Sequence, residues 1–334
     1  MFHIKLKNGK SFHCDENSTV FEAAKQNGLF LEHSCLAARC RSCVALIESG
    51  TTIDKLDDLV LSKEEKLKNW TLTCNAIPRS DLALDVEDLS GIQVSDKKII
   101  PAKINTIKKV NSTIVEVSLR LPPNSNFRYN PGQYVNISKG ELKRSYSIAN
   151  AGHMEDSLTF FIKKYSNGLM SRYWFDQAKV NDLLRIEGPI GSFFYKETEA
   201  QNIIFLATGT GIAPIKAILE GLDLKHPNLR NKKFLVFNGA KYESDLFWKP
   251  FELNDSLNLE YIPVLSRETE NWKGEKGYIQ EAVIKSGIDL NKSQVYACGS
   301  KIMIESAKKL LAENGLNIKN FYSDIFVASN TMEL

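Results

Sequence analysis

Four cysteines stand at spacings that suit iron coordination. Cys35, Cys40 and Cys43 follow the pattern C-x4-C-x2-C, and Cys74 lies further along the chain. Each iron of a two-iron cluster needs two thiolates, and this spacing is the plant-type [2Fe–2S] pattern. Four-ligand zinc sites usually contain two C-x2-C pairs, whereas here only Cys40 and Cys43 form such a pair. The spacing therefore predicts a [2Fe–2S] cluster, with a zinc site or unrelated thiols as the weaker alternatives.

A second group of residues could hold a planar cofactor that carries a pyrophosphate. Arg144-Ser145-Tyr146-Ser147 lies on a predicted strand shortly after Pro131-Gly132. An arginine can pair with a pyrophosphate, a tyrosine can stack on a planar ring, and a serine can donate to a ring nitrogen. Gly168-Leu169-Met170-Ser171 begins a predicted helix, and a glycine-opened helix start can bind phosphate. Either tetrapeptide alone is a weak indication.

A third group could bind a dinucleotide. Thr208-Gly209-Thr210-Gly211 connects a predicted strand to a predicted helix. Glycines at such a turn allow the backbone to approach a pyrophosphate closely. The loop is not the G-x-G-x-x-G motif. Cys298 and Gly299 end a later predicted strand, and Cys298 taken alone would be a buried strand cysteine.

Three segments must position these residues. The pattern of residues 1–90 predicts an α+β domain. Asn8-Gly9 indicates a hairpin, Ser18 or Thr19 would cap a first helix, and Ser62 would cap a second. Residues 88–98 predict a linker. Residues 99–197 contain short strands broken by turns such as Gly188-Pro189, which predicts an antiparallel β-barrel. Residues 200–334 alternate strands with helices, as a doubly wound parallel sheet does. Cys14 lies on a probable strand and is expected to be a small buried residue.

Composition limits the classes of partner. A chain of 334 residues is long enough for two or three domains. It has no run of eighteen apolar residues, so no transmembrane span is expected. The first residues lack the apolar block of a secretory signal, so we expect a cytoplasmic protein. A net charge of +3 with scattered lysines does not indicate nucleic-acid binding.

The motifs in this order resemble the ferredoxin–NADP reductase family, with a β-grasp ferredoxin domain, an FAD-binding barrel and a nucleotide-binding domain. The resemblance implies that Arg144 and Ser171 face the FAD pyrophosphate. It implies that Tyr146 contacts the isoalloxazine and that Ser147 lies near N5. The other residues implied around the flavin are Ser145, Phe161, Ile162, Lys163, Gly168 and Met170.

The same resemblance implies a site for NAD(P)H. Thr208, Gly209, Thr210 and Gly211 would serve the nucleotide, with Cys298, Gly299 and Phe326 beside the nicotinamide. With Tyr146 and Ser147, Cys298 would be the third catalytic residue. A 2′-phosphate needs cations and hydroxyls, and arginine offers a planar fork for it. The resemblance places it against Ser266, Arg267, Lys276 and Tyr278, so NADPH is favoured and NADH remains possible. The alternative is a solvated loop, because Lys and Glu alternate there.

Two positions in the cysteine loop depart from ferredoxin-like domains. The residues that match Ala38 and Arg41 are often glycine or another small residue in those domains. Arg41 places a cation beside the cluster, which should favour the reduced state. Alternatively, Arg41 would contact an acidic partner protein.

Several stretches resemble the CDP-6-deoxy-Δ3,4-glucoseen reductases more closely. Among them are residues 144–150, 184–189, 295–300 and 321–327. This resemblance implies a reductase that passes electrons from NAD(P)H through FAD and the cluster to a partner protein. The partner would be an iron–sulfur dehydrase of 3,6-dideoxyhexose synthesis. The alternatives are the reductase component of a multicomponent oxygenase and a non-catalytic electron-transfer subunit.

Overall fold

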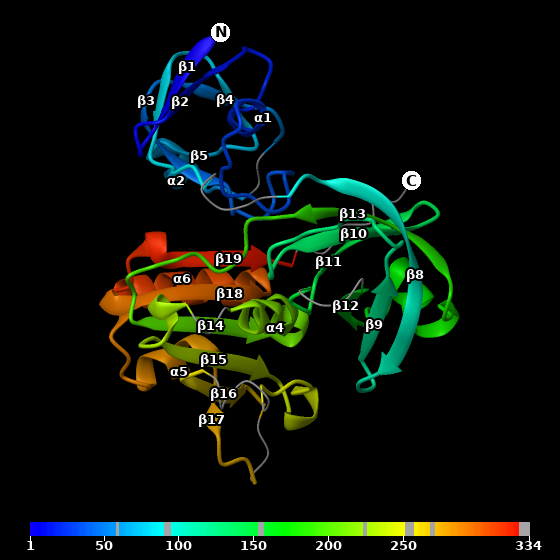
Figure 1. The fold of residues 1–334 in the computed structure, drawn as a ribbon. Helices are drawn as coiled ribbons and strands as arrows, with labels where there is room; N and C mark the ends of the chain where they lie inside the picture. The colour runs from blue at the N-terminus through cyan, green and yellow to red at the C-terminus, as the bar shows by residue number, and fades with distance from the viewer. Residues whose placement is uncertain are drawn as a thin grey trace. The chain divides into compact units, whose positions relative to one another are not determined.

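The computed structural model describes residues 1–57, 60–89, 95–152, 157–222, 226–250, 257–267 and 271–326 (Figure 1). The chain forms two compact units, and the second of them is Ser95–Phe326. The first contains the α+β domain, and the second contains both the barrel and the parallel sheet. The predicted fold class is confirmed, whereas the exact domain boundaries at residues 90, 99, 197 and 200 stay predictions.

The first unit is built on a five-stranded sheet in the order β2-β1-β7-β3-β5. β1 (Phe2–Leu6) and β2 (Ser11–Cys14) are antiparallel around Asn8-Gly9, as predicted. Cys14 is 1% exposed and lies in the domain core, which confirms the prediction for this residue. The remaining strands are β3 (Val44–Ser49), β4 (Thr52–Asp54), β5 (Trp70–Leu72), β6 (Ala76–Pro78) and β7 (Leu82–Leu84).

Both helices of this unit begin at the predicted capping residues. α1 (Val20–Gln26) starts after Thr19, whose hydroxyl accepts the Glu22 N–H, and the Glu22 carboxylate accepts the Thr19 N–H. α2 (Lys63–Leu67) starts after Ser62 with the same reciprocal pair to Glu65. Each capping box satisfies two amides that the first helical turn leaves without partners.

The predicted linker is partly anchored. The Asp88 carboxylate accepts the Phe30 N–H at 2.7 Å and the Lys10 ammonium at 2.5 Å, and its side chain is fully buried. Residues 88 and 89 therefore belong to the first unit, because their polar groups are used there. Residues 90–94 lie outside the described part of the chain, and Lys97 pairs with Glu187 in the second unit.

The barrel is an antiparallel six-stranded sheet in the order β11-β10-β13-β8-β9-β12. Its edge strands β11 and β12 contact each other, which closes the sheet. Gly188-Pro189 was expected to break a strand, but it lies inside β13. The strands are β8 (Lys98–Lys109), β9 (Ile114–Arg120), β10 (Tyr134–Lys139), β11 (Leu142–Ser147), β12 (Ser157–Lys163) and β13 (Leu183–Ile190). After β12 come α3 (Leu169–Arg172) and a π-helical turn, η1 (Tyr173–Gln177).

The third sheet is parallel, in the order β17-β16-β15-β14-β18-β19. The predicted helix after every strand is found as α4, α5 and α6, with two differences in the described residues. Within residues 226–250, β15 is followed only by the 3₁₀ turn η4 (Glu243–Asp245), and β16 is followed by β17 before α5. The elements are β14 (Asn202–Thr208), α4 (Ile212–Gly221), β15 (Lys233–Ala240), β16 (Leu259–Leu265), β17 (Glu275–Lys276), α5 (Ile279–Lys285), β18 (Ser293–Gly299), α6 (Lys301–Glu313) and β19 (Phe321–Ile325).

The barrel and the parallel sheet share one hydrophobic core. Phe161 of β12 packs in the same cluster as Phe205 and Ile215, and its ring meets that of Phe247 edge-on at 5.1 Å. The Lys216 ammonium on α4 donates to the Ala149 carbonyl at 2.9 Å. This shared packing fixes the end of β12 beside the loop that follows β14.

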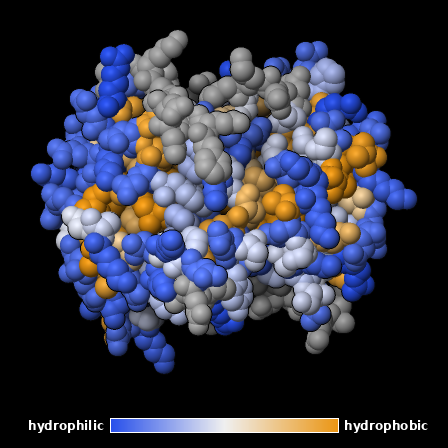
Figure 2. Space-filling view, turned by 90° about the horizontal axis from the view of Figure 1, so that it is seen from below, coloured by the Kyte–Doolittle hydropathy of each residue, from blue (hydrophilic) through white to orange (hydrophobic). Residues whose placement is uncertain are grey.

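None of the described helices is long and apolar enough to cross a membrane. The face shown in Figure 2 is mainly hydrophilic, with separate groups of hydrophobic residues.

Candidate functional site

The four predicted cluster ligands come together as two pairs. Cys35, Cys40 and Cys43 lie in the loop between α1 and β3, and Cys74 follows β5. The Cys43 and Cys74 sulfurs are 3.2 Å apart. The Cys40 sulfur accepts the Cys35 N–H at 3.3 Å, and its thiol hydrogen-bonds the Cys35 sulfur. Among the described residues, no three His, Cys, Asp or Glu side chains surround a single point as one metal ion requires. Two sulfur pairs suit two irons better than one zinc ion.

The surroundings of the sulfurs fit a cluster that carries negative charge. Ala37 and Arg39 donate their backbone N–H groups to the Cys35 sulfur at 3.4 and 3.3 Å. The hydrogen bond from Cys40, followed by these amides, lowers the pKa of Cys35 to about 6, whereas the hydrogen bonds to the paired sulfurs and burial raise the pKa of Cys40 and of Cys43. The Thr73 side chain is buried beside Cys74, and its hydroxyl has no partner in the part of the chain that the structure describes. A buried hydroxyl without a partner is costly, and a bound group could satisfy it.

The loop that carries the ligands has a left-handed backbone at three residues. The φ angles are +51° at Leu36, +53° at Ala38 and +63° at Arg41. Glycine adopts such angles without a steric penalty, whereas other residues do not. This explains physically why glycine suits positions 38 and 41.

Arg41 does not extend away from the domain. Its guanidinium pairs with both carboxylate oxygens of Glu65, and Nη1 also donates to the Val60 carbonyl at 2.5 Å. The sequence did not predict this partner. The Glu65 carboxylate already pairs with the Arg41 guanidinium, which argues against an acidic partner protein as its main contact.

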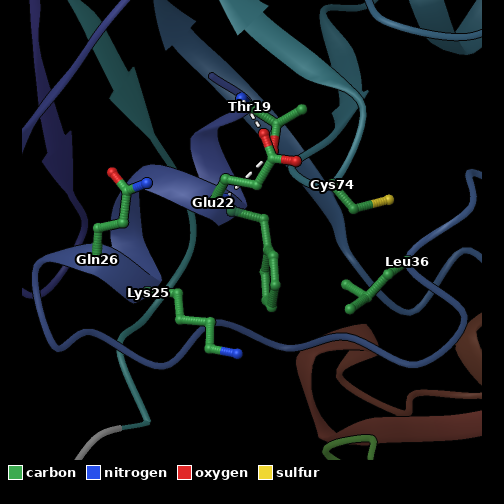
Figure 3. Close-up of a pocket in the computed structure, with 7 residues that line it drawn as sticks. Thr19, Glu22, Lys25, Gln26, Leu36 and Cys74 are labelled. Carbon is green, nitrogen blue, oxygen red and sulfur yellow. Dashed lines mark hydrogen bonds between the residues drawn. The ribbon is translucent and has the colours of Figure 1, made fainter.

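A hollow of about 450 Å³ lies beside Cys74 (Figure 3). One wall is α1, and Leu36 and Cys74 stand on the other side. Leu36 is 44% exposed although it directly follows a predicted ligand. The lining residues are Thr19, Phe21, Glu22, Lys25, Gln26, Leu36 and Cys74.

In the barrel, Tyr146 is held in place by Trp174. The Trp174 indole N–H donates to the Tyr146 hydroxyl at 3.0 Å, and the two rings meet edge-on. Burial raises the pKa of Tyr146 to about 12. Arg144 lies two residues earlier on β11 and therefore on the same face of the strand. A fixed aromatic ring and a nearby guanidinium on one edge strand fit a flavin and its pyrophosphate.

The other predicted flavin residues differ in their exposure and packing. Ser147 is buried, whereas Ser145 is exposed and donates to Asn136 at 2.7 Å. Met170 and Ile162 lie in the barrel core, and Phe161 lies in the shared core. Packing therefore accounts for these three apolar side chains without a ligand.

Gly168 and Ser171 form a tight turn with the end of β12. The Ser171 hydroxyl accepts the Tyr165 N–H at 2.7 Å. A Cβ on Gly168 would lie 3.1 Å from the Ser171 Cβ. In this arrangement the Ser171 hydroxyl already serves the turn, so a contact with a pyrophosphate stays a prediction.

The predicted nucleotide loop packs directly against the end of β18. A Cβ on Gly211 would lie 2.2 Å from the Cys298 carbonyl oxygen, and one on Gly299 would lie 2.2 Å from the Thr208 hydroxyl. Gly209 differs, because its φ is +56° and the nearest atom to an added Cβ is the Lys163 ammonium at 3.9 Å. Gly211 and Gly299 thus permit close packing, and Gly209 leaves an open side that a pyrophosphate could approach.

The structure brings the remaining predicted nicotinamide residues together. The Phe326 N–H donates to the Gly299 carbonyl at 3.0 Å. Cys298 pairs with Asp324 in the sheet, and its thiol is fully buried in the shared core. Burial, followed by Asp324, raises the pKa of Cys298 well above its ordinary value. The thiol itself does not reach the surface, so a catalytic role for Cys298 stays a prediction.

The four predicted 2′-phosphate residues also converge. Ser266 and Arg267 directly follow β16, and Lys276 pairs with Leu265 across the parallel β16–β17 ladder. Tyr278 precedes α5 and is 61% exposed. Glu268, which the motif includes, lies outside the described residues. Two cations, a hydroxyl and an exposed aromatic ring therefore gather at one end of the sheet.

Sequence reasoning missed two residues that shape these sites. Trp174 fixes Tyr146 and Glu65 fixes Arg41, whereas Lys163, which was predicted at the flavin, also lies near Gly209 of the nucleotide loop. The Ser62–Glu65 capping box was recognisable in the sequence, but it did not reveal the second partner of Glu65. The contact between Trp174 and Tyr146 joins segments that no local pattern connects.

Three family models match the chain in the expected order. They are a 2Fe-2S iron-sulfur cluster binding domain over residues 4–79, an oxidoreductase FAD-binding domain over residues 101–195 and an oxidoreductase NAD-binding domain over residues 205–309. The chain accordingly binds a [2Fe–2S] cluster, FAD and a pyridine nucleotide, as the sequence predicted.

Known proteins resemble the chain over almost its whole length. It is 36% identical over 329 residues to the CDP-6-deoxy-L-threo-D-glycero-4-hexulose-3-dehydrase reductase of Yersinia pseudotuberculosis, covering 98% of this chain and 99% of that protein. It is 28% identical to the anthranilate 1,2-dioxygenase electron transfer component of Acinetobacter baylyi, covering 98% and 97%. A crystal structure of an Amycolatopsis cytochrome P450 reductase has the same fold, with a TM-score of 0.75 at 22% identity and coverage of 98% and 99%. The chain therefore belongs to the ferredoxin reductase family with an N-terminal [2Fe–2S] domain, whose members pass electrons from NAD(P)H through FAD to the cluster and on to a partner.

Proposed function

We propose that this reductase delivers its electrons to a 3-dehydrase that acts on a CDP-6-deoxy-4-hexulose in 3,6-dideoxyhexose synthesis. The observation that carries the proposal is the 36% identity, over nearly the full length of both chains, to a reductase named for that dehydrase. The oxygenase components are 28% identical or less over a similar length.

The proposed roles follow from the positions of the side chains. Bound FAD supplies the conversion of a two-electron hydride into single electrons. Tyr146, fixed by Trp174, would orient the flavin ring, and Arg144 on the same strand face would pair with the pyrophosphate. Gly209 would admit the nucleotide pyrophosphate, with Lys163 as a nearby cation. Cys35, Cys40, Cys43 and Cys74 would hold the cluster. Hydride transfer needs no protein base, so the protein contributes geometry and electrostatics.

Reconstitution tests the choice of partner. The holoprotein, NADPH, a CDP-6-deoxy-4-hexulose 3-dehydrase and its substrate are mixed without oxygen, and deoxygenated sugar is measured by mass spectrometry. We expect product only when the reductase is present. Reduction of cytochrome c by NADPH in the same preparation, with no sugar product, would contradict the proposed partner and leave the reductase activity intact.

Oxygenase partners are the second candidate, because the 28% identical relative serves a dioxygenase and also covers the chain. A hydroxylase component supplied in place of the dehydrase provides the comparison. The rate of NADPH oxidation is measured without cytochrome c. A higher rate with the hydroxylase than with the dehydrase would favour this second function. A holoprotein that holds FAD and cluster but reduces neither cytochrome c nor ferricyanide would instead be a non-catalytic subunit.

We further propose that NADPH is the preferred nucleotide. Arg267 and Lys276 stand on neighbouring segments, where their cations can meet a 2′-phosphate together with the Ser266 hydroxyl. The substitution Arg267→Ala should lower kcat/KM for NADPH by about tenfold to a hundredfold, the worth of a charge-assisted hydrogen bond. The value for NADH should hardly change, since NADH lacks this phosphate. Equal losses with both nucleotides would contradict the proposal.

A further inference from the structure

Arg41 and Glu65 join the cysteine loop to the start of α2. The pair is bidentate, and Nη1 of Arg41 additionally donates to the Val60 carbonyl at 2.5 Å. The two side chains are 21% and 32% exposed, so the pair is largely shielded from water. Bidentate arginine–carboxylate pairs combine charge with a fixed geometry.

The Glu65 carboxylate has a second hydrogen-bond partner. Its Oε2 also accepts the Ser62 N–H at 2.8 Å as part of the capping box. The start of α2 and the residues before it are therefore held to the loop through two groups, the Val60 carbonyl and the Glu65 carboxylate. Leu61 adds apolar packing, because it lies in one cluster with Ala38 and Cys43.

The loop needs such support because of its backbone. Arg41 has φ +63° in a position next to Cys40, and a residue with a side chain is strained there. Interactions elsewhere must hold such a conformation in place. The contacts to Glu65 and Val60 are the ones that the Arg41 side chain makes.

We propose that Arg41 and Glu65 are positioning residues that hold the loop closed over Cys40 and Cys43 and whose opposite charges balance beside the cluster. This inference rests on the proposed set of four cysteine ligands. Loss of either partner opens the loop, so both losses should speed the release of the cluster. The charge effects differ in sign, because removing Arg41 leaves an unpaired anion and removing the Glu65 charge leaves an unpaired cation. An added anion favours the oxidised cluster and an added cation favours the reduced one.

The test compares Arg41→Gln, Glu65→Gln and the double variant in the holoprotein. Glutamine at position 65 keeps the capping box, since Gln also serves there, so only the charge pair is lost. Lys55→Gln is the matched control, because Lys55 pairs at 2.9 Å with Glu22, the capping-box glutamate of α1. Two quantities are measured: the rate at which the [2Fe–2S] absorbance decays in excess EDTA, and the reduction potential of the cluster by EPR-monitored titration.

We expect both single variants to lose the cluster about tenfold faster than the wild type, in line with a charged hydrogen bond that is partly exposed. The double variant should be no worse than the faster single variant, and Lys55→Gln should match the wild type. The potential should fall in Arg41→Gln and rise in Glu65→Gln. If Arg41→Gln does not assemble a cluster, Arg41→Gly takes its place for the reduction potential, which should again fall, and Glu65→Gln alone supplies the decay rate, because glycine also relieves the backbone strain at position 41.

Decay rates within twofold of the wild type in the single variants, or shifts of potential in the same direction, would overturn the inference. A wild-type protein without a [2Fe–2S] spectrum, or a Cys74→Ser variant with an unchanged one, would instead refute the proposed ligands. The two failures are therefore distinguishable.

Discussion

The hydroxyl of Tyr146 is held by a hydrogen bond from Trp174. The donor and acceptor atoms are 3.0 Å apart, and the two rings pack edge-on. The substitution Trp174→Phe keeps an aromatic ring and removes the donor. We expect the Kd for FAD to rise about fivefold, which corresponds to the ~1 kcal/mol of a neutral hydrogen bond. Titration of the apoprotein with FAD, followed by flavin fluorescence, measures this change.

The adjacent residue provides the control. Tyr173 is also buried, and its hydroxyl donates to Asp182 at 2.7 Å rather than to Tyr146. Tyr173→Phe should lower the free energy of unfolding by a similar amount and leave the Kd for FAD unchanged. Equal weakening of FAD binding in both variants would show that the barrel, and not the hydrogen bond to Tyr146, governs affinity.

The loop after β14 contains two glycines with different tasks. Gly211 is packed against the Cys298 carbonyl, so a methyl group there must displace the end of β18. Gly211→Ala should lower the free energy of unfolding by about 1–3 kcal/mol, as overpacking does. Gly209 has open space beside it, so Gly209→Ala costs only the ~1 kcal/mol of an unfavourable φ.

Nucleotide binding should show the opposite order. The methyl group of Gly209→Ala would stand where the pyrophosphate approaches, and we expect the Kd for NADPH to rise about tenfold, a penalty of ~1.4 kcal/mol. Thermal unfolding and calorimetric titration of both variants separate the two effects. A Gly209→Ala variant that binds NADPH as the wild type does would mean that the nucleotide does not use this side of the loop.

Glu187 on β13 joins β10, β11 and the residue that precedes β8. Its carboxylate pairs with Lys143 and Lys97 and also accepts from Asn136. The Lys143 and Lys97 ammonium groups lower the pKa of Glu187 from 4.5 to about 2. A carboxylate whose folded pKa is lowered stabilises the fold above its unfolded pKa, and this stabilisation is lost as the pH falls through the folded value.

Acid unfolding should therefore distinguish Glu187→Gln from the wild type. In urea titrations followed by circular dichroism, the wild type should be the more stable protein above about pH 5, and the difference should vanish near pH 2. Glu141→Gln serves as the control, because Glu141 is exposed in the turn before β11. A difference between wild type and Glu187→Gln that does not change with pH would contradict this assignment.

The elements that local chemistry determines were predictable from the sequence. Thr19 and Ser62 start helices because their side chains cap the first turn, and Asn8-Gly9 forms a hairpin because glycine adopts φ +82° there. The expectation that Gly188-Pro189 breaks a strand was wrong, because β13 continues through it. Asp88 was placed in a linker although long-range partners bury its carboxylate, and no local pattern announces such partners.

The predicted sites show the same contrast between local features and long-range partners. The cysteine spacing and the residues around positions 266 and 276 were recognisable, because backbone register brings them together. The partners that fix them were not recognisable. Glu65 reaches Arg41 and Trp174 reaches Tyr146 across segments whose contact only the folded chain creates.

The whole molecule separates the entry of electrons from their exit. The predicted FAD and nucleotide residues lie within Ser95–Phe326, and the four cysteines lie in the other unit. Cys74→Ser should therefore abolish the [2Fe–2S] EPR signal and the support of a dehydrase. Reduction of ferricyanide by NADPH should stay within about twofold of the wild type, because the predicted flavin and nucleotide residues belong to the other unit and ferricyanide can take electrons from the flavin directly. Loss of the ferricyanide activity as well would place the cysteines upstream of the flavin.

Anaerobic titration of the holoprotein with NADPH tests the order of transfer most directly. Visible absorbance reports the flavin, and EPR reports the reduced cluster. The proposed order predicts that the flavin bleaches and that the [2Fe–2S] signal grows with it, to the size that dithionite produces. A bleached flavin beside a cluster that dithionite reduces but NADPH never does would contradict electron transfer from NAD(P)H through FAD to the cysteine-bound cluster.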